Sequence, residues 1–290
     1  MKTFLLALVL AALACSRALA QVKVEVMLEQ EQFLPSETVP VAVRITNRSG
    51  QPLHLGEEPN WLTFEVESAD GLIVVKNAEV PVLGEFDLGS SQMATKRVDL
   101  SPYFDITKPG RYRIIATVRI KEWRAETASP AKSFDVITGA KIWSQDFGVP
   151  VSASATNRSP EVRKYTLQKA NYLRTQLRLY VEVSDAAEAH VFKVVNIGKT
   201  VSFSSPETQV DRYSNLHVLW QSGAAHFTYA VVNPDGGLER QEIYDYVTAR
   251  PRLNMTDDGT VTVLGGVRRV KAEPMPMVKS PNDLPPAEKP

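Results

Sequence analysis

Apolar and polar residues alternate with a period of two along most of the chain between residues 22 and 138. Such alternation is typical of strands that bury one face and expose the other. Clusters of Gly, Pro, Asn and Asp separate the alternating segments and predict turns. The clearest alternating segments are Val22–Leu28, Val39–Ile45, Leu62–Val66, Tyr112–Ile120 and Phe134–Val136. About seven short strands within this length predict an antiparallel β-sandwich.

Two segments of this region carry a resemblance to a known family. Phe33–Val39, with the alternating strand and the turn Asn47–Gly50 after it, is similar to the opening of bacterial extracellular immunoglobulin-like domains. BsuPI-type and macroglobulin-like sandwiches begin in this way. Pro109–Ile114 resembles the Pro-Gly-x-Tyr start of a late strand in such domains. The resemblance covers residues 22–138 and implies an immunoglobulin-like sandwich.

The resemblance also implies roles for two aromatic residues. Tyr112 is expected to form a tyrosine-corner hydrogen bond, and Trp61 to be a core tryptophan on a middle strand. The cysteine pair of antibody domains is missing. A fold of this kind hosts many functions, and proteinase inhibition of the BsuPI type is one that the resemblance alone suggests.

The second half, residues 161–270, also reads as antiparallel β structure. Leu179–Val183, Leu216–Trp220 and Phe227–Val231 alternate in the same way. Glu161–Gln176 fits either a helix capped at Ser159 or a strand, and its alternation slightly favours a strand.

Two segments of this half are similar in sequence at an offset of about 37 residues. Leu179–Val183 is matched by Leu216–Trp220, and Ala189–Asn196 by Ala225–Asn233, with Gly259–Gly266 as a fainter third copy. This spacing is loosely like that of β-propeller blades. A propeller of four blades would need about 160 residues at this spacing, more than the region holds. A two-fold repeat and a chance likeness of two amphipathic hairpins both remain open.

The chain therefore divides into several segments. We expect an immunoglobulin-like sandwich over 21–138, a connector over 139–160, a second β domain over 161–270 and a proline-rich, disordered tail over 271–290. Within the connector, Lys141–Gly148 is a candidate for one more strand.

The first 20 residues read as a secretory signal peptide. Lys2 precedes the apolar run Phe4–Ala14, and Ala18-Leu19-Ala20 is a small-x-small cleavage site. We expect an exported protein, periplasmic or extracellular, without a transmembrane span. Cys15, the single cysteine, is either removed with the signal or becomes the acylated N-terminus of a lipoprotein. In the first case the mature chain has no disulfides.

The charge balance and the Asn-x-Ser/Thr triplets bear on nucleic-acid binding and on glycosylation. Lys plus Arg and Asp plus Glu number 33 each, which argues against nucleic-acid binding. Asn47, Asn157 and Asn254 each begin an Asn-x-Ser/Thr sequence. These triplets are glycosylation acceptors or, as we favour, ordinary turn sequences.

Candidate catalytic chemistry is sparse. The four histidines are His54, His190, His217 and His226, and no zinc-protease, nucleophile-elbow or nucleotide-binding motif accompanies them. We expect no catalytic site, metal or cofactor. A hydrolase of the glycosidase type would need its residues in the second β domain, where the candidate cluster is His190, His226, Asp235 and Asp257. Hairpin turns explain the two aspartates equally well.

Exposed aromatic residues offer a binding alternative. Trp123 lies between two charged residues, and Tyr244 and Tyr246 are two positions apart on one predicted strand. Aromatic residues on a β surface suit carbohydrate or peptide binding. We therefore expect an exported, non-catalytic binding or structural protein with a protein or carbohydrate partner in the cell envelope or outside it.

Overall fold

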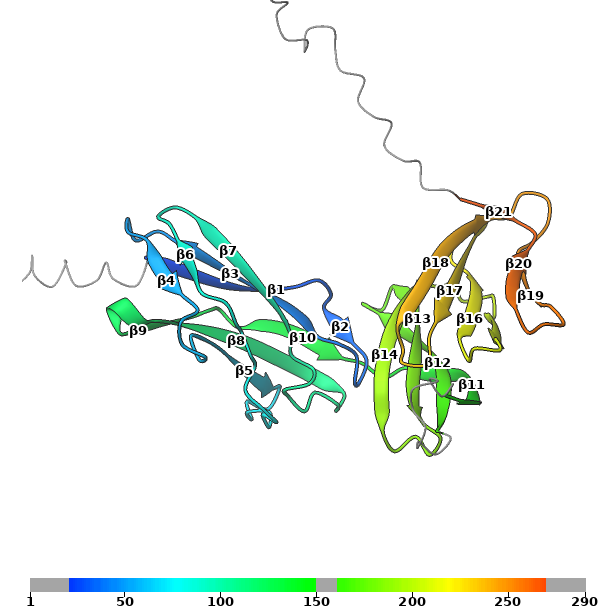
Figure 1. Ribbon diagram of the computed structural model, residues 1–290, viewed down its shortest axis with the longest axis horizontal. Helices are drawn as coiled ribbons and strands as arrows, with labels where there is room; N and C mark the ends of the chain where they lie inside the picture. The colour runs from blue at the N-terminus through cyan, green and yellow to red at the C-terminus, as the bar shows by residue number, and fades with distance from the viewer. Residues whose placement is uncertain (1–20, 150–160, 270–290) are drawn as a thin grey trace, which may run out of the picture.

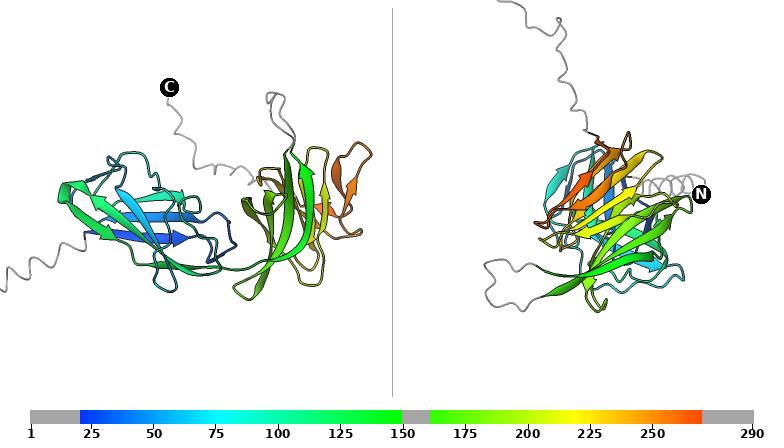
Figure 2. Two further views of the ribbon diagram at one scale, coloured as in Figure 1. Left: turned by 90° about the horizontal axis from the view of Figure 1, so that it is seen from below. Right: turned by 90° about the vertical axis from the view of Figure 1, so that its right-hand side faces the viewer.

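The computed structural model describes residues 21–149 and 161–269, which form two β units connected by a single passage of chain (Figures 1 and 2). The predicted signal peptide with Cys15, the triplet at Asn157 and the tail over 271–290 lie outside the described residues. Almost every regular element is a strand and almost every pair is antiparallel, as the alternation predicts.

The first unit contains ten strands and one short 3-10 helix. Its strands are β1 (Val22–Leu28), β2 (Gln32–Phe33), β3 (Pro40–Asn47), β4 (Leu53–Leu55), β5 (Leu62–Ser68), β6 (Phe86–Leu88), β7 (Met93–Asp99), β8 (Gly110–Ile120), β9 (Ala125–Ala128) and β10 (Lys132–Val136), with the helix η2 (Lys121–Trp123) between β8 and β9. One sheet has the order β1-β3-β7, and the other has the order β2-β10-β8-β5 with β9 also paired to β8. Strands β4 and β6 form a small separate pair, and β2 pairs with β10 in parallel.

One hydrophobic core lies between the two larger sheets of this unit. The alternating positions of β1, β3, β5 and β8 are buried together in it. Trp61 directly precedes β5, is 2% exposed, and donates from Nε1 to the carbonyl of Val82 at 2.9 Å. The Tyr112 hydroxyl donates to the carbonyl of Lys108 at 2.7 Å, which is the predicted corner hydrogen bond.

Asn47 illustrates how turn chemistry accounts for a glycosylation triplet. Its side chain is fully buried, and Nδ2 donates to the carbonyls of Gln51 and Leu88 at 2.7 and 2.9 Å. Its Oδ1 accepts from the backbone of Ser49 at 2.9 Å. The amide nitrogen of Asn47 is therefore occupied in the folded protein.

The second unit consists of two larger sheets and one hairpin. Its strands are β11 (Ala140–Gly148), β12 (Val162–Tyr172), β13 (Gln176–Asp185), β14 (Val191–Lys199), β15 (Glu207–Val210), β16 (Leu216–Gln221), β17 (His226–Val232), β18 (Leu238–Asp245), β19 (Arg252–Met255), β20 (Val261–Leu264) and β21 (Val267–Arg268). The sheets have the orders β11-β12-β13-β14 and β15-β16-β17-β18-β21, and β19 pairs with β20. Residues 161–176 thus contain the favoured strand.

The predicted connector over 139–160 requires a correction. Ala140–Gly148 is a full strand of the second unit, paired with β12 over its length. Phe147 of this strand is 6% exposed and stacks on Tyr165 at 4.0 Å between ring centroids. The passage between the units is therefore the short segment between β10 and β11.

The core of the second unit lies between its two larger sheets. The strand orders show where the repeated sequence segments lie. Leu179 and Val181 of β13 pack with Leu216, Val218 and Trp220 of β16 in one buried cluster. The sequence similarity aligns β13 and β14 with β16 and β17. These are the third and fourth strands of one sheet but the second and third of the other. The matching segments thus do not occupy equivalent positions in the two sheets.

The two units contact each other through the turn after β2 and the outer face of β12, β13 and β14 (Figure 1). Leu34 packs with Ala170, Tyr180 and Val194 in a small buried cluster. Three hydrogen bonds surround it: the Glu31 amide to Tyr172 Oη at 3.1 Å, the Leu173 amide to Gln32 Oε1 at 2.6 Å, and Arg178 Nη1 to Gln30 Oε1 at 3.3 Å. The backbones of Glu37 and Val194 also form an isolated parallel β-bridge.

Glu37 places a carboxyl group inside this contact. It is 5% exposed, and it accepts from the Leu34 amide and from Gln30 Nε2, both at 2.8 Å. Burial raises the pKa of Glu37, although the two hydrogen bonds and Arg178 oppose that rise.

A pH dependence of stability follows from Glu37. Because its folded-state pKa is raised, the folded protein holds the proton longer, and stability is lost as the pH rises through that pKa. We expect Glu37→Gln, which keeps an acceptor for Leu34, to flatten the decline above about pH 4.5, the ordinary range of a glutamate. Urea unfolding of wild type and variant across pH 4–8 measures the difference, with exposed Glu29→Gln as the control. A wild type that gains stability over this range relative to Glu37→Gln contradicts the assignment.

Candidate functional site

An open groove of about 510 Å³ lies in the second unit, on the outer face of the sheet β15-β16-β17-β18-β21. The β19–β20 hairpin covers the neighbouring part of that face, where Leu253 and Val263 pack on Leu219, Phe227 and Tyr229. The loop from β15 to β16, strands β16 to β18, the turn after β17 and the start of β20 line the groove. Its lining residues are Asp211, Asn215, His217, Tyr229, Val231, Asn233, Glu239, Arg240, Thr260 and Val261. Eight of these ten residues carry hydrogen-bonding side chains.

A chain of hydrogen bonds fixes the floor of the groove. His217 Nε2 lies 3.1 Å from Asp211 Oδ2, and His217 Nδ1 lies 2.6 Å from the hydroxyl of Tyr229. His217 and Tyr229 face outward from the sheet because they alternate with the inward residues Leu216 and Ala230. Both ring nitrogens of the histidine are thus held by groups of the protein.

Asp211 is held as a carboxylate by several donors. Its Oδ1 accepts from the amides of Tyr213 and Asn215 at 2.9 and 2.8 Å, and its Oδ2 accepts from Asn215 Nδ2 at 3.0 Å. Burial raises the pKa of Asp211, but the hydrogen bonds from His217, Asn215 and Tyr213 outweigh it and lower the pKa overall.

Tyr229 is a neutral hydrogen-bond donor at ordinary pH. The side chain is 3% exposed, and burial raises its pKa to about 12. In the tautomer that carries its proton on Nε2, His217 donates to Asp211 and accepts from the tyrosine hydroxyl at Nδ1.

A β-bulge brings two successive side chains of β18 to the groove. Val231 of β17 pairs with Arg240, but the next residue, Val232, pairs with Leu238, so Glu239 has no partner across the ladder. An extra residue of this kind re-aims the side chains around it. Glu239 and Arg240 therefore both line the groove, although neighbouring residues of a regular strand point to opposite faces.

The structure does not gather the four candidate residues of the hydrolase hypothesis. His190 and Asp235 are connected through two other side chains: Arg163 pairs with Asp235 at 2.8 Å and lies 4.6 Å over the Phe192 ring, on which His190 packs at 4.9 Å. His226 begins β17, whereas Asp235 follows its other end, about 20 Å away along an extended strand.

The remaining hydrolase candidates have other neighbours. His226 Nδ1 lies 2.7 Å from Asp245, which also pairs with Arg269 at 2.9 Å. Asp257 lies in the turn between β19 and β20. Over residues 21–149 and 161–269 there is no group of three His, Cys, Asp or Glu side chains arranged to hold a metal ion.

The three candidate binding aromatics also lie apart. Trp123 belongs to η2 of the first unit and packs half-buried against that unit's core. Tyr244 is on β18, where its hydroxyl donates to Glu242 at 3.0 Å and its ring meets Tyr229 edge-on at 6.4 Å. Tyr246 follows the end of β18 and is 49% exposed. Tyr244 alone lies beside the groove, through its contact with Tyr229.

Sequence reasoning singled out only one residue of the groove's polar floor, His217, as one of four histidines. Asp211, Tyr229, Glu239 and Arg240 were not identified. The Asp211–Asn215 loop has the composition of a turn, and Leu238–Glu242 is a polar run without alternation, in which a bulge leaves no pattern.

Comparison with known proteins adds little to this picture. No family model matches the chain, and no curated protein matches it. Among solved structures, the sporulation control protein Spo0M from Bacillus subtilis is similar with a TM-score of 0.31 and 9% sequence identity, over 62% of this chain and 90% of that chain. In the described part of the chain, no helix has the length and apolar character needed to cross a membrane.

Proposed function

We propose that the protein is an exported, non-catalytic binding protein, and that the groove in its second β unit holds a small polar ligand or a segment of a glycan or protein partner. The observation that carries the proposal is the groove itself, an open concavity of about 510 Å³ lined mainly by hydrogen-bonding side chains. Its volume is within the range of small-molecule sites, roughly 300–1,000 Å³.

The hydrogen bonds inside the groove fix the orientations of two of its ionisable side chains, His217 and Asp211. Both nitrogens of His217 are engaged by Asp211 and Tyr229, and both oxygens of Asp211 accept from the protein. Such a network holds side chains in fixed orientations for recognition.

Ligand screening by thermal unfolding tests the proposal. A ligand at one hundred times its Kd stabilises the folded state by about 2.7 kcal/mol, which a melting curve detects readily. We expect soluble glycans or polar small molecules to raise the melting temperature of wild type. Thr260→Trp, which fills the exposed rim of the groove, should abolish the shift, and Thr107→Trp on an exposed loop of the first unit should preserve it.

The same ligands decide between binding and the glycosidase-type alternative. After prolonged incubation with the protein, we expect chromatography to return every bound glycan intact. Cleaved product from wild type but not from Thr260→Trp would establish the hydrolase instead. A ligand shift that persists in Thr260→Trp would move the binding site elsewhere.

A further inference from the structure

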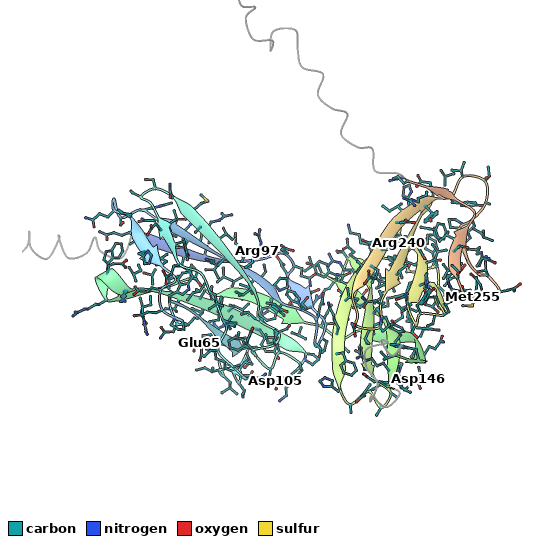
Figure 3. The ribbon with its side chains drawn as sticks, in the orientation of Figure 1. Glu65, Arg97, Asp105, Asp146, Arg240 and Met255 are labelled. Carbon is teal, nitrogen blue, oxygen red and sulfur yellow. The ribbon has the colours of Figure 1, made fainter. Side chains whose placement is uncertain are left out.

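The charged side chains of the groove differ in how many hydrogen bonds and ion pairs they make within the protein. Asp211 accepts four hydrogen bonds, and Glu239 accepts one from Asn233 Nδ2 at its Oε1 atom. Arg240 is exposed, and no ion pair or hydrogen bond to its guanidinium occurs among residues 21–149 and 161–269. Figure 3 marks Arg240 on β18.

A guanidinium without a partner in the groove selects for an anion. Its planar fork of N–H donors matches a carboxylate with two parallel hydrogen bonds. The bulge at Glu239 sets the register of β18 against β17 at Val231 and places the backbone of Arg240 beside the groove, which its side chain lines.

The acceptors around Arg240 indicate the rest of the ligand. Within the described residues, Glu239 Oε2 and Asn215 Oδ1 have no hydrogen-bond partner, although both residues line the groove. Free acceptors call for ligand donors such as hydroxyl groups. Val231 and Val261 add a small apolar surface, against which the C–H face of a sugar ring packs favourably.

We propose that the groove binds a carboxylate-bearing carbohydrate of the uronic-acid type, with the carboxylate on Arg240 and hydroxyl groups on Glu239 and Asn215. This proposal rests on the proposed function, since it specifies the ligand class of the same groove. Arg240 provides the selection for charge, and Glu239 and Asn215 provide the selection for hydroxyls.

NMR titration of the ¹⁵N-labelled full chain with D-glucuronate, D-glucose and L-serine tests the proposal. We expect glucuronate to shift amide resonances of the groove and to bind at least about tenfold more tightly than glucose or serine, as expected for one charged hydrogen-bonded contact. Arg240→Gln should weaken glucuronate binding by about tenfold or more, and Arg240→Lys should weaken it less. Arg97→Gln, on an exposed position of β7, is the matched control and should leave binding unchanged (Figure 3).

The outcomes separate this inference from the function on which it rests. Equal affinity for glucose and glucuronate, tighter binding of serine, or unchanged binding in Arg240→Gln overturns the acidic-sugar assignment while the groove remains a binding site. If none of the three probes shifts groove resonances, the assignment also fails. The Thr260→Trp screen then decides separately whether the groove binds any ligand.

Discussion

Replacing Trp220 by alanine is expected to lower the free energy of unfolding of the second β unit by about 3–5 kcal/mol, the usual cost of truncating a fully buried aromatic side chain. Trp220 is 1% exposed and packs in the core between the two sheets. Its Nε1 also donates to the carbonyl of Lys199 at 2.7 Å. The substitution therefore opens a cavity and removes the indole's hydrogen bond at once.

Urea denaturation followed by far-UV circular dichroism measures this loss. Trp220→Phe retains much of the volume but not the hydrogen bond, so we expect a smaller loss of about 1–2 kcal/mol. Trp123→Ala, at a half-buried position of the first unit, should cost less than Trp220→Ala. A loss below about 1 kcal/mol for Trp220→Ala would show that this tryptophan does not hold the two sheets together.

Leu34→Asp is expected to separate the two β units. Leu34 is 2% exposed and packs against Ala170, Tyr180 and Val194 of the second unit. A carboxylate at this position would be buried without a partner, at a cost of several kcal/mol, and separation of the units relieves that cost. The few polar contacts around the cluster oppose the separation only weakly, since a hydrogen bond contributes about 1 kcal/mol net.

Small-angle X-ray scattering detects the separation as a larger radius of gyration. Leu83→Asp is the matched control, because Leu83 is 78% exposed in the first unit and its replacement leaves the contact intact. Unchanged scattering from Leu34→Asp would mean that the units are held together by something other than this cluster.

The sequence predicts the fold well where a strand has one buried face. In β1 and β8 the alternating residues are the buried ones, and the hydrophobic pattern sets both the strand and the direction of its side chains. The corner hydrogen bond of Tyr112 is likewise local, because it spans four residues. Short-range rules suffice for such features.

The pattern is less informative where tertiary packing covers both faces. Strands β16 and β17 are buried almost throughout, since the β19–β20 hairpin covers the face that alternation assigns to water. The similar segments β13–β14 and β16–β17 hold different positions in their sheets, and no local rule states which position each occupies. The place of β11 in the second unit is hard to predict for the same reason, because its partner β12 lies beyond residues 150–160 in the sequence.

The groove is harder to predict because its residues come from several elements. Asp211 belongs to a loop, His217 and Tyr229 to neighbouring strands, and Arg240 to a third strand. Their convergence depends on strand order, and the direction of Glu239 depends on a bulge that has no sequence signature here. Of the residues that the sequence favours, Asp235 and Asp257 lie in hairpin turns, whereas Tyr244 lies on β18 and Trp123 in η2.

We propose that the protein binds its ligand in the groove beside the β19–β20 hairpin. Hydrogen–deuterium exchange of the full chain, with and without the ligand that stabilises it most, tests this claim directly. We expect protection of residues 211–217, 229–240 and 259–261. Protection confined to the first β unit, or to β11–β14, would contradict it.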